Sequence, residues 1–294
     1  MREPPSIPHL LPSWTAIDPA SLAGVENVLI LGTGHSAIDH VQLLLAAGYK
    51  GKFTLMSRHG FLPAVHKQIE PCNIDTADIP FGQRLSVAWR WFRGRVASFE
   101  RGGGDWRSVL DGMRPHAQAF WQSLPIEEQR RFIRHARAWY DVRRHRLAPS
   151  IRATLDHLEG EGRLQVIAGR VRSIADTGSE AEVTFRRRSS AKDEVLKMQG
   201  IVECIGFNLD PRTARNPLLA NLLNQGLTQP GPHGFGLKVS PACGLIDVDG
   251  RAASDLFAVG PLTRGQFWEA VGLPDVRQQC AQLALLLSAA RPDV

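Results

Sequence analysis

The sequence contains a glycine-rich turn whose spacing suits the binding of a pyrophosphate. Gly32, Gly34 and Ala37 form a G-x-G-x-x-A pattern. In such a turn the first glycine permits a tight bend, the second lets phosphates approach the backbone, and the alanine keeps the next helix close to the strand. The amides at the start of that helix attract the anion, so we expect a dinucleotide-binding site. A tight strand-to-helix turn without a ligand is the structural alternative. The residues expected to contact the cofactor here are Gly32, Thr33, Gly34, His35, Ser36 and Ala37.

The end of the second strand in such a unit distinguishes the two nicotinamide dinucleotides. An acidic residue there would hold the ribose 2′-hydroxyl of NAD. Here the segment ends in Ser57-Arg58-His59 and has no carboxylate, and a guanidinium can pair with a 2′-phosphate. The sequence therefore favours NADP(H) over NAD(H), with Arg58 as a cofactor-binding residue. A solvated loop cation is the alternative interpretation of Arg58.

Other reactive side chains form neither a recognisable triad nor a metal site. His35, Ser36 and Asp39 are too close in sequence to meet in the relay geometry of a hydrolase. His135 and His145 have no histidine four residues away and no neighbouring acid cluster, so we expect no metal. No side chain is assigned as catalytic.

The cysteines and the chain ends indicate a reduced, soluble protein. No two cysteines have the C-x-x-C spacing of a zinc site or a redox dithiol, which predicts free thiols and a cytoplasmic location. The first residues lack the apolar stretch of a secretory signal, and the apolar run from Leu283 to Leu287 is shorter than a membrane span. We therefore expect no membrane partner. The cysteines are Cys72, Cys204, Cys243 and Cys280.

The residues around the glycine-rich turn have the periodicity of a strand, a helix and a second strand. Val28 to Leu31 is an apolar run that ends at the turn, and apolar residues at helical spacing follow from Ile38 to Leu45. Gly48 is a helix stop signal, and Lys52 to Ser57 alternates like a strand. Residues 27–57 thus predict a βαβ unit, which favours a parallel sheet.

The rest of the chain alternates between helical and strand-like patterns. Residues 83–159 predict three to five helices. Four strand-like runs follow and resemble a β-meander. A short helix is expected near 216–224 and a final helix from Pro274. The four strand-like runs are residues 164–168, 170–175, 181–187 and 195–204.

Positive charge is concentrated in one segment. The 294 residues include 35 basic and 29 acidic ones, a net charge of +6, and residues 130–146 alone contain seven arginines and one acid, Asp141. A general polyanion-binding surface is therefore not implied. Arginines flank Trp139-Tyr140, a combination that can bind single-stranded nucleic acid. A solvated helix face, or a clamp for an anionic substrate or cofactor phosphate, is the favoured interpretation.

Several motifs, in order along the chain, resemble those of a known protein class. Residues 28–39 (VLILGTGHSAID), ECIG at 203–206, and GLIDVD at 244–249 leading into LFAVG at 256–260 are similar to the two-dinucleotide-binding flavoproteins. Within that class the chain looks most like the bacterial FAD-NAD(P)-binding proteins related to N-hydroxylating monooxygenases. The resemblance covers nearly the whole chain. Three further stretches support it, namely GGDWR, HRLAP and GPLTRG at residues 103–107, 145–149 and 260–265.

The resemblance implies a nicotinamide domain inserted into a flavin domain. Gly260 would lie beside the pyrophosphate and ribityl chain of FAD, and the helix after Pro274 would direct its positive end at the isoalloxazine. The implied reaction is hydride transfer from NADPH to the flavin, which then meets oxygen, as in a monooxygenase, or another acceptor. The cysteine spacing argues against dithiol chemistry. The implied flavin-side contacts are Gly206, Gly260, Pro261 and Leu262.

One motif of that class is missing from the sequence. In those proteins a G-x-G-x-x-G that holds the ADP half of FAD lies well upstream of the nicotinamide motif, whereas 31 residues precede Gly32 here. We therefore expect either the NADPH-binding portion of a longer flavoenzyme or a non-catalytic NAD(P)-binding or sensing module. Nucleic-acid binding through Arg130–Arg146 is a third, disfavoured hypothesis.

Together these features predict an α/β fold. It consists of a Rossmann-like nucleotide-binding domain with a helical insertion and a β-meander, plus the C-terminal part of a second dinucleotide-binding domain. A small-molecule substrate is expected, and its pocket should be lined by residues of the helical insertion and by residues 263–268. The expected boundaries are a lead-in at 1–26, the NAD(P)-binding domain at 27–205 with its insertion at about 83–160, and the FAD-like region at 206–294.

Overall fold

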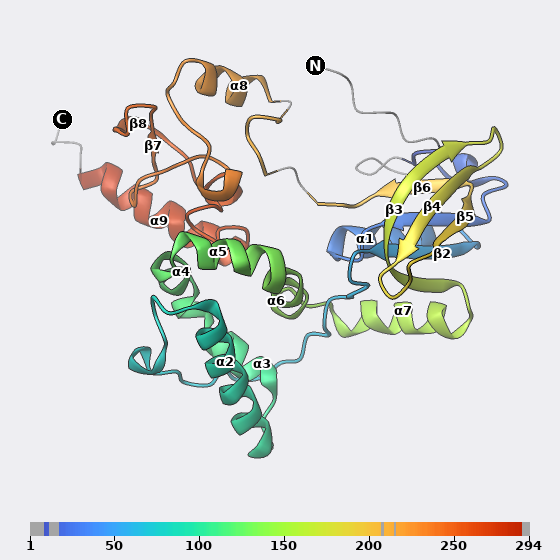
Figure 1. The fold of residues 1–294 in the computed structure, drawn as a ribbon, viewed down its shortest axis with the longest axis horizontal. Helices are drawn as coiled ribbons and strands as arrows, with labels where there is room; N and C mark the ends of the chain where they lie inside the picture. Colours follow the sequence, from blue (N-terminus) through green and yellow to red (C-terminus); the bar gives the residue numbers. More distant parts are fainter. Residues whose placement is uncertain (1–8, 12–17, 207–208, 215, 290–294) are drawn as a thin grey trace. The chain divides into compact units, whose positions relative to one another are not determined.

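The protein folds into two compact units, each built from separate stretches of the chain. The structure is a computed structural model that describes residues 9–11, 18–206, 209–214 and 216–289 (Figure 1). Unit 1 consists of residues 1–68 and 135–206, and unit 2 of residues 69–134 and 207–294. Both units therefore combine an early and a late part of the sequence.

Unit 1 is built around one sheet with the strand order β5-β4-β3-β2-β1-β6. β1 pairs in parallel with β2 on one side and with β6 on the other, and β2 pairs in parallel with β3. β3, β4 and β5 continue as antiparallel neighbours. The expected parallel sheet is thus present. Its strands are β1 (Asn27–Leu31), β2 (Lys52–Ser57), β3 (Leu164–Asp176), β4 (Ala181–Arg187), β5 (Asp193–Met198) and β6 (Gly200–Glu203).

The expected βαβ unit is confirmed at the centre of this sheet. Val28, Leu29 and Ile30 of β1 are completely buried, as are the apolar residues of α1 (His35–Ala46) that face the sheet. The helix ends before Gly48, whose φ of +87° a residue with a side chain rarely adopts. Burial of this apolar face stabilises the strand-turn-helix geometry from which the glycine-rich turn projects.

The strands after the helices differ from the expected runs. The runs at 164–168 and 170–175 form the single strand β3, which pairs first with β2 and then with β4. The run at 195–204 is divided into β5 and β6. Between them, the Gln199 amide donates to the Asn27 carbonyl, and the Gln199 side-chain oxygen accepts from the Asn27 amide at 2.9 Å. Both halves are rich in strand-forming residues, so the pattern could not show where the chain changes its partner strand.

Two further helices belong to unit 1, namely α6 (Arg137–Arg144) and α7 (Pro149–Gly160). The loop after β2 holds the end of α6, because the Ala64 amide donates to the Val142 carbonyl at 2.7 Å and the Leu147 amide donates to Ala64 at 2.8 Å. Leu155 and Leu158 of α7 are buried in the core formed by β1, β2 and α1. The loop and α6 are thereby fixed beside the carboxyl ends of the parallel strands.

Unit 2 contains helices and a two-stranded sheet. The expectation of three to five helices over 83–159 was wrong, because six α-helices, α2 to α7, occupy this stretch. Pro115 lies in the first turn of one helix and Pro125 is the N-cap of the next, so the helical stretch is divided into more, shorter helices than expected. The elements of unit 2 are α2 (Leu85–Arg101), α3 (Trp106–Gly112), α4 (Arg114–Ser123), α5 (Ile126–Arg131), α8 (Pro217–Asn224), β7 (Gly244–Ile246), β8 (Ala252–Phe257) and α9 (Leu273–Ala289).

Aromatic contacts join the helices of unit 2 to its C-terminal part. The rings of Trp121 and Trp268 are both buried, with centroids 4.6 Å apart. The Trp121 indole N–H donates to the Gly265 carbonyl at 3.1 Å, and the Gln118 amide donates to the Gln266 carbonyl at 3.2 Å. These contacts explain why residues 69–134 form one compact unit with residues 207–294.

Candidate functional site

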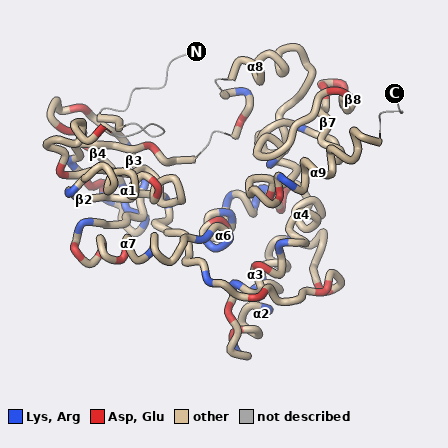
Figure 2. The backbone as a smooth tube through the Cα atoms, turned by 180° about the vertical axis from the view of Figure 1, so that it is seen from behind, with Lys and Arg blue, Asp and Glu red and all other residues tan. Residues whose placement is uncertain are grey.

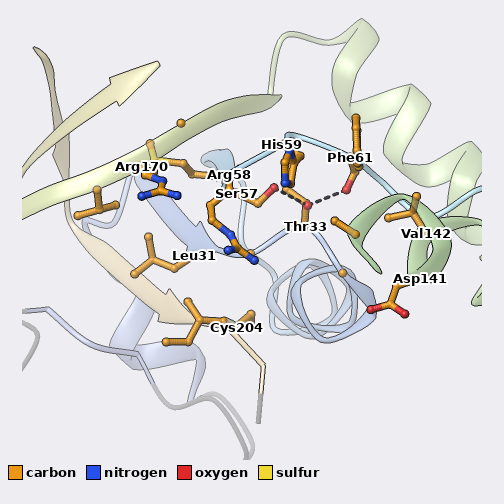
Figure 3. Close-up of a pocket in the computed structure, with 17 residues that line it drawn as sticks. Leu31, Thr33, Ser57, Arg58, His59, Phe61, Asp141, Val142, Arg170 and Cys204 are labelled. Carbon is orange, nitrogen blue, oxygen red and sulfur yellow. Dashed lines mark hydrogen bonds between the residues drawn. The ribbon is translucent and has the colours of Figure 1, made fainter. Parts of the chain in front are cut away.

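A pocket of about 610 Å³ opens in unit 1 at the carboxyl ends of the parallel strands (Figure 3). Residues that follow β1, β2 and β6 line it, together with residues of β3 and α6. The chain leaves β1 toward β2, while β6 lies on the other side of β1. In open α/β sheets, ligands bind in the crevice at such a switch of strand order. The pocket therefore lies where the glycine-rich turn was expected to bind a dinucleotide.

Gly32 lies in a position that excludes any side chain. Its φ is +140°, and a Cβ added there would come within 2.3 Å of the Cys204 carbonyl oxygen. The Gly32 amide donates to the Met56 carbonyl at 2.7 Å. The turn after β1 is thus held against the ends of both neighbouring strands.

Gly34 differs from Gly32 because nothing lies within 4 Å of the position of its missing Cβ. It is the N-cap of α1 with an extended backbone, a conformation open to other residues, and no side chain among the described residues caps this helix end. Gly34 also lines the pocket. The first amides of α1 are therefore available to an anion that approaches the open side of Gly34.

Thr33 connects the turn after β1 to the loop after β2. Its hydroxyl is buried, donates to the Phe61 carbonyl at 2.7 Å and lies 2.9 Å from the Ser57 hydroxyl. The Ser57 hydroxyl in turn accepts from the Gly60 amide at 3.0 Å. The Thr33 side chain therefore holds the walls of the pocket together, which its position in the motif did not reveal.

The remaining residues of the motif lie behind or beside the pocket. Ala37 is buried in the core, and the Ser36 carbonyl accepts from the His40 ring at 2.6 Å. His35 is exposed and its ring stands edge-on to that of His145, with centroids 6.4 Å apart. Of the described pocket lining, the motif contributes Gly32, Thr33 and Gly34. Contact of a ligand with residues 35–37 stays a prediction.

Arginines gather at the end of the pocket formed by β2 and β3. Arg58 follows β2, Arg170 lies on β3, and both line the pocket. The guanidinium of neither arginine forms a hydrogen bond or ion pair with another residue of the described part of the chain. Arg188 lies nearby, and its guanidinium donates to Nδ1 of His59 at 2.6 Å. Burial lowers the pKa of His59, and Arg188, Arg58 and Arg170 lower it further. This end of the pocket is therefore strongly cationic.

Sequence reasoning found Arg58 but missed Arg170, Arg188 and Phe61. In the run Arg186-Arg187-Arg188, the first two arginines pair across the hairpin with Asp193 and Glu194. Arg188 instead turns toward His59. The order of β2 and β3 in the sheet brings these arginines together, and the sequence contains no local signal for that order.

Cys204 forms the opposite end of the pocket, after β6. Its sulfur lies 3.4 Å from Nδ1 of His40, and Ile205 beside it is exposed in the pocket wall. Burial raises the pKa of the Cys204 thiol to about 11, with further contributions from Asp39 and Glu203. A neutral thiol and an apolar side chain therefore contrast with the arginines at the other end.

The flavin-side residues from the resemblance are not among the described residues that line this pocket. Gly206 ends unit 1 with a φ of +93°, whereas Gly260, Pro261 and Leu262 form a short 3-10 turn in unit 2. The Gly260 amide donates to the Gln279 side chain at 2.7 Å, Pro261 has no amide hydrogen, and the Leu262 carbonyl accepts from a backbone amide. The Gly260 amide already has an acceptor and Pro261 has no amide hydrogen, so neither fits a role as donor to a flavin phosphate. A cofactor contact by these four residues stays a prediction.

Arginines of the arginine-rich segment, residues 130–146, contact other side chains of the chain. Figure 2 colours the Lys and Arg positions blue along the backbone. Arg131 pairs with Glu128 at 3.0 Å in unit 2, and Arg137 pairs with Asp141 at 3.2 Å in unit 1. The Arg143 guanidinium lies 4.0 Å from the centroid of a Trp139 ring. These contacts are typical of a helix surface, and nucleic-acid binding stays a hypothesis.

Within the described ranges, no helix is long and apolar enough to cross a membrane, and no group of three or more His, Cys, Asp or Glu side chains is arranged for a metal ion.

The fold is that of the two-dinucleotide-binding flavoproteins, as the motifs predicted. Ornithine N-hydroxylase KtzI of Kutzneria sp. 744 matches with a TM-score of 0.54 and 13% identity over 90% of this chain and 54% of its own. Ornithine hydroxylase PvdA of Pseudomonas aeruginosa matches with a TM-score of 0.53 and 12% identity, over 92% of this chain and 54% of its own. Cadaverine monooxygenase DfoA of Erwinia amylovora matches with a TM-score of 0.56 and 13% identity, over 91% of this chain and 52% of its own.

The chain spans about half the length of these solved structures. No family model and no curated protein sequence matches it. At this level of identity the comparisons establish the fold, and the geometry of the pocket must support any function.

The two glycines of the turn should respond differently to substitution. Gly32→Ala should lower the free energy of unfolding by about 3 kcal/mol or more, because the new methyl overlaps the Cys204 carbonyl and the backbone is strained. Gly34→Ala should change it by less than about 0.5 kcal/mol, because the methyl meets open space. Urea unfolding followed by circular dichroism measures both. Equal losses in the two variants would contradict this geometry.

The Cys204 thiol should be slow to react with alkylating agents. With a pKa of about 11, about one thiol in a thousand is ionised at pH 8. We expect iodoacetamide to modify Cys204 at least about a hundredfold more slowly than the exposed Cys280. The Cys204 rate should rise about tenfold for each pH unit. Peptide mass spectrometry over a pH series measures both rates, and a Cys204 rate that levels off near pH 8 would show that its pKa is not raised.

Proposed function

We propose that unit 1 binds NADPH and that the chain is the NADPH-binding portion of a flavin-dependent oxidoreductase. The observation that supports this best is the form of the pocket. It places the open side of Gly34 and the start of α1 next to two arginines without partners among the described residues. A pyrophosphate and a second phosphate group are the anions that such a pair of sites suits.

The pyrophosphate of the dinucleotide would lie at Gly34. The missing side chain leaves room for phosphate oxygens to approach the backbone, and the amides of the first turn of α1 would donate to them. The first turn of α1 contains no acidic residue that would repel the anion.

The 2′-phosphate would lie between Arg58 and Arg170. In this fold the adenosine half lies toward the second strand, and here β2 and β3 occupy that side of β1. The nicotinamide half would then lie toward β6, beside Cys204 and Ile205. Guanidinium groups bind phosphate in a bidentate manner, so NADP(H) is the favoured cofactor over NAD(H).

The reaction we propose is hydride transfer from NADPH to a flavin. Solved structures of this fold include KtzI with reduced FAD, NADP+ and L-ornithine, and DfoA with FAD. NADPH and flavin supply the chemistry of this step, so the chain needs to bind and orient the nucleotide and requires no nucleophile. A monooxygenase-type reaction on a small-molecule substrate is the finer proposal. The flavin would have to be held by groups other than the Gly260 amide.

A second candidate function is NADPH binding without flavin chemistry. The observation that favours it is the closed set of bonds around Gly260, in which the Gln279 amide donates to the Thr263 hydroxyl at 3.1 Å and that hydroxyl donates to the Gly260 carbonyl at 2.8 Å. The turn is thus closed by its own Thr263 side chain and by Gln279 of α9. Under this proposal the chain is a nucleotide-binding or sensing module.

Removal of either pocket arginine should change nucleotide selectivity. Arg58→Ala and Arg170→Ala should each weaken NADPH binding by about tenfold or more, because a charge-assisted bond to the 2′-phosphate is lost. NADH binding should stay unchanged. The control is Arg93→Ala, an exposed arginine of unit 2, which should not alter either affinity. Isothermal titration calorimetry gives the dissociation constants, and equal losses for NADPH and NADH would refute the 2′-phosphate site.

Two further measurements separate the candidate functions. FAD-dependent oxidation of NADPH by the purified chain would support the oxidoreductase proposal. NADPH binding without turnover in the presence of added FAD would support the binding module instead. If the wild-type chain fails to bind NADPH at millimolar concentration, or if Gly34→Ala binds it as tightly as the wild type, the proposed site is wrong.

A further inference from the structure

Phe61 is an aromatic side chain exposed inside the pocket. Phe61 is 38% exposed and lines the pocket together with charged residues such as Arg58 and Arg170. The Phe61 backbone is anchored, because its carbonyl accepts the Thr33 hydroxyl at 2.7 Å. The ring is stacked on that of His59, with centroids 5.3 Å apart and an angle of 15° between the planes. The two rings therefore cover part of each other, and Phe61, the more exposed of the two, presents an aromatic surface in the pocket wall (Figure 3).

Arg188 determines the protonation of His59. A guanidinium can only donate, so the 2.6 Å contact makes Nδ1 of His59 the acceptor and leaves the ring hydrogen on Nε2. The charged groups facing the ring are Arg188, Arg58 and Arg170, all of one sign. Burial lowers the pKa of His59 most and these cations lower it further, so the neutral imidazole is favoured, and a neutral flat ring is suited to stacking on the Phe61 ring.

The position of the two rings indicates which part of the dinucleotide they contact. His59 directly follows Arg58 at the end of β2, on the side of β1 where the adenosine half would lie. Cys204 and Ile205, at the nicotinamide side, lie after β6. The aromatic surface thus adjoins the base that is linked to the 2′-phosphorylated ribose.

We propose that the Phe61 ring, backed by the ring of His59, stacks on the adenine base, and that Arg188 is the positioning residue that holds His59 in place. This inference rests on the proposed NADPH site. It assigns a specificity role to the loop after β2 and links the end of β4 to the nucleotide pocket through Arg188.

The experiment uses 2′,5′-ADP, which contains the adenine and the 2′-phosphate but no nicotinamide. Phe61→Leu should weaken its binding by about tenfold, the range expected when an aromatic partner of a base is removed. The control is Phe99→Leu, because Phe99 is 36% exposed in unit 2 and lies outside the pocket. A derivative with the fluorescent 1,N6-ethenoadenine base should be quenched by the wild type and by Phe99→Leu, and less by Phe61→Leu.

The outcomes separate this inference from the proposed function. If the wild type binds 2′,5′-ADP and Phe61→Leu binds it equally well, the stacking surface is wrong while the NADPH site stands. If Phe61→Leu weakens nicotinamide mononucleotide and leaves 2′,5′-ADP unchanged, the rings contact the other half of the cofactor and the inference is overturned. If the wild type binds neither NADPH nor 2′,5′-ADP, both proposals fail.

The role of Arg188 has its own test. In Arg188→Gln one facing cation is lost, so the pKa of His59 should rise toward its ordinary value, as measured by NMR titration of the histidine resonances. Binding of 2′,5′-ADP should then vary between pH 5.5 and 7 more than in the wild type, and Arg188→Lys should restore the wild-type profile. An unchanged His59 titration in Arg188→Gln would show that Arg188 has no positioning role.

Discussion

The close approach of the turn after β1 to the end of β6 is the constraint on which the pocket depends. Gly32 lies so near the Cys204 carbonyl that no side chain fits between them, and its backbone conformation favours glycine. With the turn held there, Gly34 faces the cavity and α1 begins at the cavity wall. Thr33 fixes the same turn from the other side through the Phe61 carbonyl. The pocket is therefore a product of how three strand ends pack.

The two ends of this pocket differ in charge in a way that matches the ligand we propose. At β2 and β3 the arginines have no carboxylate partner among the described residues, which leaves a positive end. At β6 the thiol of Cys204 is held neutral and Ile205 is apolar. NADPH has a 2′-phosphate at one end and a nicotinamide ring at the other, so its polarity follows the same direction. The proposed orientation of the cofactor rests on this asymmetry.

The sequence predicted local features better than long-range ones. The βαβ unit, the turn at Gly32 and Gly34, and Arg58 were all found because adjacent residues determine them. The order of the strands was not accessible, so Arg170 and Arg188 were missed, and β5 and β6 were read as one run. Likewise the motif did not predict that the Thr33 side chain bonds to a loop 28 residues away. Each failure concerns a contact made by residues distant in sequence.

The central claim is that NADPH binds at the open side of Gly34 in unit 1, and amide NMR of the 15N-labelled chain during NADPH titration tests it most directly. We predict saturable shifts for the amides of Gly34, His35 and Ser36 and for the residues at Arg58 and Arg170, since these surround the expected phosphates. Shifts confined to unit 2, or no shift at millimolar NADPH, would contradict the account.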